Sequence, residues 1–208
     1  MLKKLQAKLT LLHTLNEHLI CCCNYGSTTY ETTTEHSDID MVCIVEDIIE
    51  WNKIYQCKID NLDIQYMTLN QFKELLNEHH ILALETYFYN YDILKEYIPS
   101  FEVDNWKLRQ SISSVASNAW AKANKKMSVV KDYDIYKGKK SLFHSLRVLM
   151  FGIQMAEHQK IVDFKEASSL WNSIYENESK DWINYKTEYK PLYNKLKSQL
   201  TKLCPKPI

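Results

Sequence analysis

The stretch Tyr25-Gly26-Ser27, separated by ten residues from Asp38-Ile39-Asp40, decides the fold that we expect for the first half of the chain. Ile20 to Asn24 is a short apolar run that ends at the Gly-Ser pair, which predicts a buried strand entering a turn. Residues 28–37 are small or polar almost throughout and predict a loop. Residues 39–45 are apolar and partly β-branched, and predict a second strand.

Asp38 and Asp40 are two residues apart on this strand, so they point to one face while Ile39 points to the other, toward the core. Two adjacent carboxylates repel each other unless a cation lies between them. Mg²⁺ prefers such hard oxygen ligands and completes its shell with water and substrate phosphates. The pattern therefore favours a metal site, although two aspartates can also cap or line a turn before a strand.

Gly26 and Ser27 predict a phosphate-binding turn beside these carboxylates. A glycine after a buried strand allows a close approach of the backbone to a phosphate. The Ser27 hydroxyl and nearby amides can then donate hydrogen bonds to it. A plain turn residue is the alternative interpretation of Ser27.

A third carboxylate is expected because two-metal phosphoryl and nucleotidyl transfer generally needs a further carboxylate, which helps activate the attacking hydroxyl. Residues 57–67 alternate between apolar and polar types and predict a third strand that carries Asp63. Asp60 competes with Asp63, but its odd separation would place it on the opposite face of that strand. We prefer Asp63 because Leu62 and Ile64 anchor it to the core.

The remainder of the first half predicts helices. Residues 2–18 carry leucines at three- and four-residue steps, which indicates an amphipathic helix. A helix or turn begins at Asp47 and runs to Trp51. Thr68 is a candidate N-cap for a helix from Leu69 to about Asn77. A second short helix is expected over residues 81–88.

From Trp106 onward the apolar pattern is helical, and the last helix is expected over residues 184–203. Two apolar stripes support this assignment: Ile112, Val115, Ala116, Ala119, Trp120 and Ala123 form one, and Leu142, Leu146, Leu149, Met150, Ile153 and Met155 the other. The first hundred residues are thus α/β and the second hundred all-α, with Pro99-Ser100 as the boundary. We expect an α+β protein with domains over residues 1–99 and 100–208.

The order Tyr25-Gly26-Ser27, then Ser37-Asp38-Ile39-Asp40-Met41, then Asp63 resembles the DNA polymerase beta-like nucleotidyltransferase superfamily over roughly residues 15–70. Residues 63–72, where the third carboxylate strand runs into a helix with a Phe, look like its RNA-repair-pathway DNA polymerase beta family branch. Residues 139–147 are similar to the helical motif of that branch, with a His and an Arg one turn apart.

The resemblance implies a small mixed sheet flanked by helices, followed by a helical region. It also implies transfer of a nucleoside monophosphate from an NTP to a hydroxyl, with release of pyrophosphate. Asp38 and Asp40 would hold Mg²⁺ or Mn²⁺, and Asp63 would hold the catalytic metal and assist deprotonation of the acceptor.

Nucleotide contacts are expected from Gly26, Ser27, Lys140, His144 and Arg147. His144 and Arg147 lie three residues apart on one helix face. They either meet the nucleotide or acceptor, or pack against the first domain. Lys140 either binds phosphate or belongs to a solvated helix start.

The composition and the apolar runs bear on whether the protein binds nucleic acid, spans a membrane or forms disulfides. The 208 residues carry 26 basic and 26 acidic side chains, so a whole-protein basic footprint for nucleic acid is absent, although residues 122–140 are lysine-rich. No apolar run approaches the roughly 18 residues of a membrane span, and no signal peptide is expected. None of the six cysteines forms a CxxC pair, which favours free thiols in a reducing, cytoplasmic setting.

RNA is the acceptor that we expect. The alternatives are a nucleotidyltransferase that modifies a protein, such as an AMPylase or an antitoxin that modifies its toxin, or a small molecule, and a non-catalytic nucleotide-binding module. The sequence identifies neither the NTP nor the oligomeric state.

Overall fold

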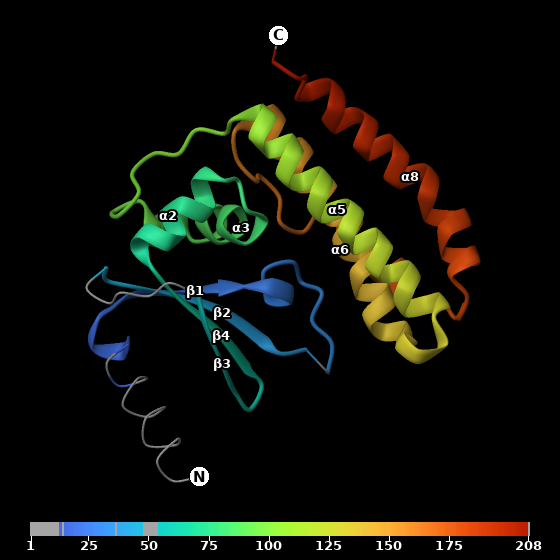
Figure 1. The fold of residues 1–208 in the computed structure, drawn as a ribbon, viewed down its shortest axis with the longest axis horizontal. Coiled ribbons are helices and arrows are strands. Elements are labelled where there is room, and N and C mark those ends of the chain that lie inside the picture. The colour runs from blue at the N-terminus through green and yellow to red at the C-terminus, as the bar shows by residue number, and fades with distance from the viewer. Residues whose placement is uncertain (1–12, 14, 36, 48–53, 208) are drawn as a thin grey trace.

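The computed structural model describes residues 13, 15–35, 37–47 and 54–207. The helix expected over residues 2–18 and the helix or turn from Asp47 to Trp51 lie mostly outside these described residues. A four-stranded sheet lies on one side of the molecule, and the long helices of the second half of the chain lie along the other side (Figure 1). The α+β class expected from the sequence is confirmed.

The sheet consists of β1 (Leu19–Tyr25), β2 (Ile39–Val45), β3 (Tyr55–Ile59) and β4 (Leu62–Thr68) in the order β1-β2-β4-β3. The central strands β2 and β4 are parallel, while the two outer strands pair antiparallel to them. The predicted bounds of β2 are confirmed to the residue.

The single strand predicted over residues 57–67 is wrong, because the chain turns back at Asp60 and Asn61 to form the hairpin of β3 and β4. Asp60 has a φ of 52°, in the left-handed region that Asp tolerates better than most residues. The apolar positions change phase at this turn, from Cys57 and Ile59 to Leu62, Ile64 and Tyr66, and this change is the sequence signal of the hairpin that the prediction overlooked.

Each face of the sheet has its own apolar cluster. The face formed by Cys21, Cys23, Val42, Ile44 and Met67 belongs to the main core, which extends to the helices. The opposite face buries a second cluster, formed by Leu15, Cys43, Val45, Cys57, Ile64 and Tyr66. A residue's parity along its strand therefore decides whether it faces the helices.

Helix α2 (Leu69–Asn77) follows β4 directly, with Thr68 as its N-cap. The Thr68 hydroxyl accepts from the Gln71 amide, and the Gln71 side chain accepts from the Thr68 amide, which is a complete capping box. The predicted cap and helix are confirmed. Helix α3 (Ile81–Tyr89) also agrees with prediction, and the short α4 (Tyr91–Leu94) follows it.

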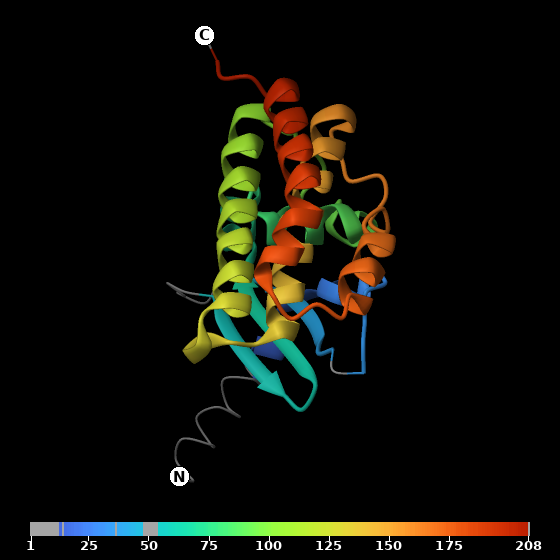
Figure 2. The same ribbon diagram turned by 90° about the vertical axis from the view of Figure 1, so that its right-hand side faces the viewer.

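The second half consists of α5 (Asn105–Ser128), α6 (Ile135–His158), α7 (Ser168–Glu176) and α8 (Trp182–Leu203). Figure 2 shows α5 and α8 beside each other, and α6 contacts both. The predicted stripes of α5 and α6 point into the core, with Val115, Trp120 and Met150 only partly buried. Helix α7 was not anticipated, and α8 begins two residues earlier than expected. Within the described residues, none of the helices has the length and apolar character that a membrane span requires.

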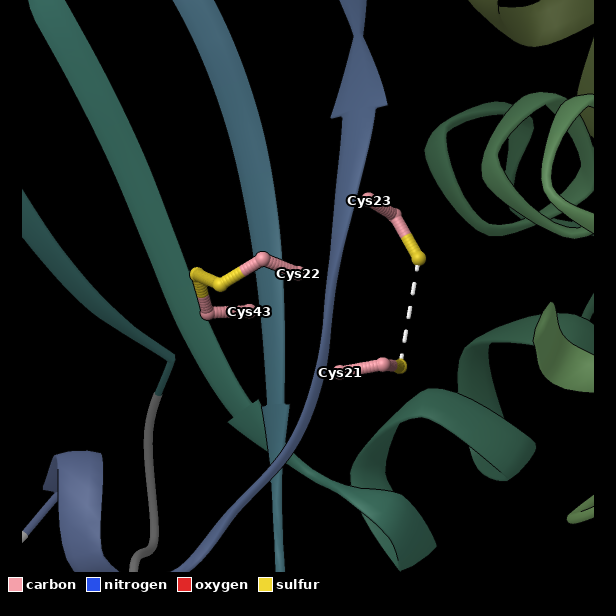
Figure 3. The surroundings of a disulfide bond; sticks show 4 residues. All are labelled: Cys21, Cys22, Cys23 and Cys43. Atoms are coloured by element: carbon pink, nitrogen blue, oxygen red, sulfur yellow. Dashed lines mark hydrogen bonds between the residues drawn. A yellow bond between two sulfur atoms is a disulfide. The ribbon is translucent and has the colours of Figure 1, made fainter.

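Cys22 and Cys43 form a disulfide that links β1 to β2 (Figure 3). They are direct partners in the antiparallel register, with Cα atoms 4.3 Å apart. The prediction of free thiols is therefore wrong for this pair, because the sequence does not show which cysteines face each other across two strands. It is confirmed for Cys21, Cys23, Cys57 and Cys204, all of which are buried.

Candidate active site

Asp40 on β2 and Asp63 on β4 are direct partners across the two parallel strands. Their parity places both carboxylates on the face that the helices cover, together with Lys58 and Gln56 of β3. Asp38 lies just before β2, two residues from Asp40. The structure thus brings the three predicted carboxylates to one region of the sheet, whereas Asp60 is exposed in the hairpin turn.

Gly26 closes one side of this region. It begins the short helix η1 (Gly26–Thr28) with a φ of 75°, a conformation that glycine adopts without strain. A Cβ atom at this position would lie only 2.1 Å from Oδ2 of Asp40. The turn therefore approaches the carboxylate so closely that only glycine fits there.

Two side chains of β3 hold the outer carboxylates. The Lys58 ammonium donates to Oδ2 of Asp38 at 2.7 Å. The Gln56 amide nitrogen lies 2.8 and 3.0 Å from the two oxygens of Asp63. In the described part of the chain, no three or more His, Cys, Asp or Glu side chains converge as a ready metal site. A metal would therefore require Asp38 and Asp63 to release these partners.

The charges nevertheless suit a cation. Burial raises the pKa of Asp40, and the negative charge of Asp63 raises it further. The hydrogen bond to Asp38 raises the pKa of Lys58, and all three carboxylates add to this effect. An ammonium group already lies within the field of the carboxylates. The donor set, made only of carboxylate oxygens, fits Mg²⁺ or Mn²⁺.

A cavity of about 410 Å³ opens between this end of the sheet and the helices. Lys122 of α5 and Lys137 and Lys140 of α6 contribute positive charge to its wall. The charge of Lys140 opposes the effect of burial on the pKa of Asp40, and the charge of Lys58 acts in the same direction. The other lining residues are Tyr25, Gly26, Ser27, Tyr30, Thr32, Asp40, Ala119, Ser141, Phe143, His144, Arg147 and Trp171.

All five predicted nucleotide-binding residues line this one cavity. Arg147, however, is already paired with a carboxylate of the protein. Its guanidinium forms a buried ion pair with Glu85 of α3 and lies 3.6 Å from the ring centroid of Tyr30. The contact with α3 agrees with the alternative that this helix face packs against the first domain.

His144 accepts a hydrogen bond through Nδ1 from Nη2 of Arg147, at 3.0 Å. Burial lowers the pKa of His144 to about 3, and the charge of Arg147 contributes. His144 is therefore a neutral imidazole near neutral pH.

The sequence interpretation missed Tyr30, Glu85 and Lys122. Glu85 had a visible signal, because it is the single charged residue within the apolar run Ile81–Tyr89. A charge at the centre of a buried helix needs a partner. Tyr30 gave no signal in its polar loop, and Lys122 is one of many lysines in α5.

Comparison with known proteins leaves the family open. No family model matches the chain, and no curated protein matches it. Among solved structures, it is similar to a nucleotidyltransferase-like protein from Exiguobacterium sibiricum 255-15, with 11% identity over 98% of this chain and 74% of the other. The TM-score of 0.32 describes a loose overlap. This likeness identifies neither the family nor the function of the chain.

Proposed function

We propose that this protein is a metal-dependent nucleotidyltransferase that transfers a nucleoside monophosphate from an NTP to a hydroxyl group of RNA and releases pyrophosphate. One observation carries the proposal: Asp40 and Asp63 lie side by side in register, and the Gly26 turn packs directly on Asp40. Of the three carboxylates, Asp40 lines the cavity, together with Gly26, Ser27 and the lysine-bearing wall.

Asp38, Asp40 and Asp63 are the residues that would hold Mg²⁺ or Mn²⁺. When bound, the metal would neutralise phosphate oxygens and make the attacking hydroxyl more acidic. Asp63 is the carboxylate that we assign to the proton of the acceptor hydroxyl. The Gln56 amide contacts both oxygens of Asp63, so it would have to release them when Asp63 takes up the metal and the proton.

The triphosphate would bind between the Gly26-Ser27 turn and the wall of α5 and α6. Backbone amides of a tight turn and lysine ammonium groups are common phosphate donors. Among the three lysines of the cavity wall, Lys140 is the one whose charge lowers the pKa of Asp40, so we assign it to the phosphate nearest the metals. The aromatic side chains of the cavity suit the base and sugar, and RNA as acceptor is supported by the lysine-rich stretch over residues 122–140.

The test is transfer of label from each of four α-labelled NTPs, with Mg²⁺ or Mn²⁺, in the presence of total cellular RNA and of cellular protein. The variant Asp38→Ala/Asp40→Ala is the negative control. The proposal expects label on RNA that disappears in the variant and in EDTA. Label on protein would support nucleotidyl transfer but show that the acceptor is a protein and not RNA. Label on neither, with NTP binding unchanged in the variant and without metal, would instead indicate a non-catalytic nucleotide-binding module.

A further inference from the structure

Three side chains from separate parts of the chain meet in a buried cluster beside the cavity. Tyr30 comes from the loop after η1, Glu85 from α3 and Arg147 from α6. Their exposed fractions are 4%, 1% and 3%, so the cluster is shielded from water. Glu85 accepts from both others: one carboxylate oxygen from the Tyr30 hydroxyl, the other from Nη1 of Arg147.

Both carboxylate oxygens of Glu85 accept hydrogen bonds within the cluster, but in the part of the chain that the structure describes the guanidinium of Arg147 is not fully hydrogen-bonded. Within the described residues, Nε of Arg147 is buried and has no hydrogen-bond partner. The guanidinium is held instead by Glu85, by His144 and by the face of the Tyr30 ring. Such a buried pair is weak evidence for a role in stability, because an apolar substitute is often no less stable. What the cluster does fix is the relative position of its three side chains.

That geometry concerns two parts of the proposed active site. Tyr30 lies three residues after Ser27, so it anchors the loop that continues the Gly26-Ser27 turn. On α6, Lys140, His144 and Arg147 follow at intervals of four and three residues and share one helix face. A shift of Arg147 along or around α6 would therefore move Lys140 relative to Asp40.

We propose that Glu85 is a positioning residue of the nucleotidyl-transfer site: by binding Tyr30 and Arg147 together, it holds the loop after Gly26-Ser27 in register with the lysine-bearing face of α6. This inference rests on the proposed function. Glu85 is absent from the residues that line the cavity, so it acts through its two partners. A second contact supports the loop from another side, since the Ser168 hydroxyl donates to the Tyr30 carbonyl at 2.8 Å.

The experiment compares steady-state kinetics of Glu85→Gln and Tyr30→Phe with the wild type, below the unfolding transition of each. Glu85→Gln keeps the shape of the side chain but removes its charge, and Tyr30→Phe removes only the hydroxyl contact. Misplacement of aligned groups lowers the rate of the chemical step, so we expect kcat to fall about ten- to hundredfold in Glu85→Gln, with a smaller fall in Tyr30→Phe. KM for the NTP should change much less than kcat.

Gly152→Ala is the matched control. Gly152 lies on the same helix, away from Lys140, and a Cβ there would approach Ile112 of α5 at 2.9 Å and Leu200 of α8 at 3.4 Å. This variant should lose stability and keep kcat. A fall in kcat of the same size in the control would overturn the inference, because general loosening of α6 would then explain the effect.

Arg147→Met separates positioning from direct phosphate binding. If Arg147 acts through position, the double variant Glu85→Gln/Arg147→Met should be little worse than either single variant. A much larger loss in Arg147→Met than in Glu85→Gln, with additive effects, would overturn the inference and make Arg147 a nucleotide ligand. If Glu85→Gln fails to fold, Tyr30→Phe decides, and an unchanged kcat in that variant counts against the inference.

Hydrogen exchange gives a readout that does not depend on activity. Amides of residues 28–35 should exchange faster in both variants than in the wild type, without added NTP, and Gly152→Ala should leave them unchanged. A wild type without transfer activity would defeat the proposed function, and the exchange data would still decide whether Glu85 holds the loop. Unchanged exchange in Glu85→Gln would overturn the inference by itself.

Discussion

The carboxylate of Asp40 occupies the space that a side chain on Gly26 would need. The distance from the position of a Cβ on Gly26 to Oδ2 of Asp40 is only 2.1 Å, and the φ of Gly26 is 75°. Two elements that are separated along the chain are therefore fitted to each other at the proposed site. The contact makes the glycine a sensitive probe of the arrangement.

Gly26→Ala should abolish nucleotidyl transfer while the protein remains folded. The left-handed backbone costs an alanine about 1–2 kcal/mol, and the new methyl group must displace Asp40. Gly152→Ala is the control, because its Cβ would approach Ile112 at 2.9 Å inside the helical core. This overpacking should cost about 1–3 kcal/mol of stability without loss of kcat. Equal activity losses in the two variants would contradict the specific role of Gly26.

Asp63→Asn should lower kcat by at least about a hundredfold, the usual cost of removing one group that stabilises a transition state. Asp60→Asn should have no effect on kcat. Asp60 is exposed in the β3–β4 turn with a φ of 52°, and asparagine tolerates that conformation. Transition midpoints from thermal unfolding will show whether both variants are folded. Loss of activity in Asp60→Asn with Asp63→Asn unaffected would reverse the assignment of the third carboxylate.

The pKa of His144, lowered to about 3, predicts a contribution to acid sensitivity. The unfolded chain binds a proton at this histidine near pH 6.5, whereas the folded protein does not until about pH 3. Stability is therefore lost as the pH falls through this window. His144→Gln should reduce the loss of unfolding free energy between about pH 7 and pH 5 by up to about 2 kcal/mol. Urea denaturation at the two pH values measures the difference, and an identical pH dependence in both proteins would contradict it.

The Cys22–Cys43 disulfide predicts a thiol count. Denatured, unreduced protein should titrate four thiols, from Cys21, Cys23, Cys57 and Cys204, and reduced protein should titrate six. Reduction removes a link between residues 21 positions apart and should lower the unfolding free energy by about 2–4 kcal/mol. Six thiols without reductant would show that the pair is not oxidised.

The observed strands and helices match the predicted ones where a local sequence pattern marks their ends. Strand Ile39–Val45 begins after a polar loop and is apolar and β-branched, and helix Leu69–Asn77 begins at a capping box. The hairpin of β3 and β4 was missed because the change of phase between Ile59 and Leu62, which marks the turn, was read as one continuous strand. Helix α7 was missed because no capping residue marks its start, since the side chain of Ala167 cannot accept a hydrogen bond.

Some residues of the candidate site could likewise be predicted from the sequence, and others could not. Asp38, Asp40 and the Gly26-Ser27 turn could be named from residue type and spacing, and so could Asp63, although the reason given against Asp60 was wrong. Their partners could not be named in this way. Lys58 and Gln56 reach the carboxylates only because β3 folds back onto β4. Lys122 and Lys140 reach the cavity only because two helices pack beside the sheet.

The sequence by itself determined the α+β class, the strand that carries Asp40, the capped helix after β4 and the apolar stripes of α5 and α6. Each depends on side-chain alternation, helical periodicity or capping, which act over a few residues. Only the tertiary structure decided that Cys22 pairs with Cys43, that Asp40 faces Asp63, and that Arg147 pairs with Glu85, 62 residues away. The physical reason is that the register of the strands decides which residues lie opposite each other in the sheet. Burial decides the ion pair, because a buried charge requires an opposite charge that neighbours in the chain cannot supply.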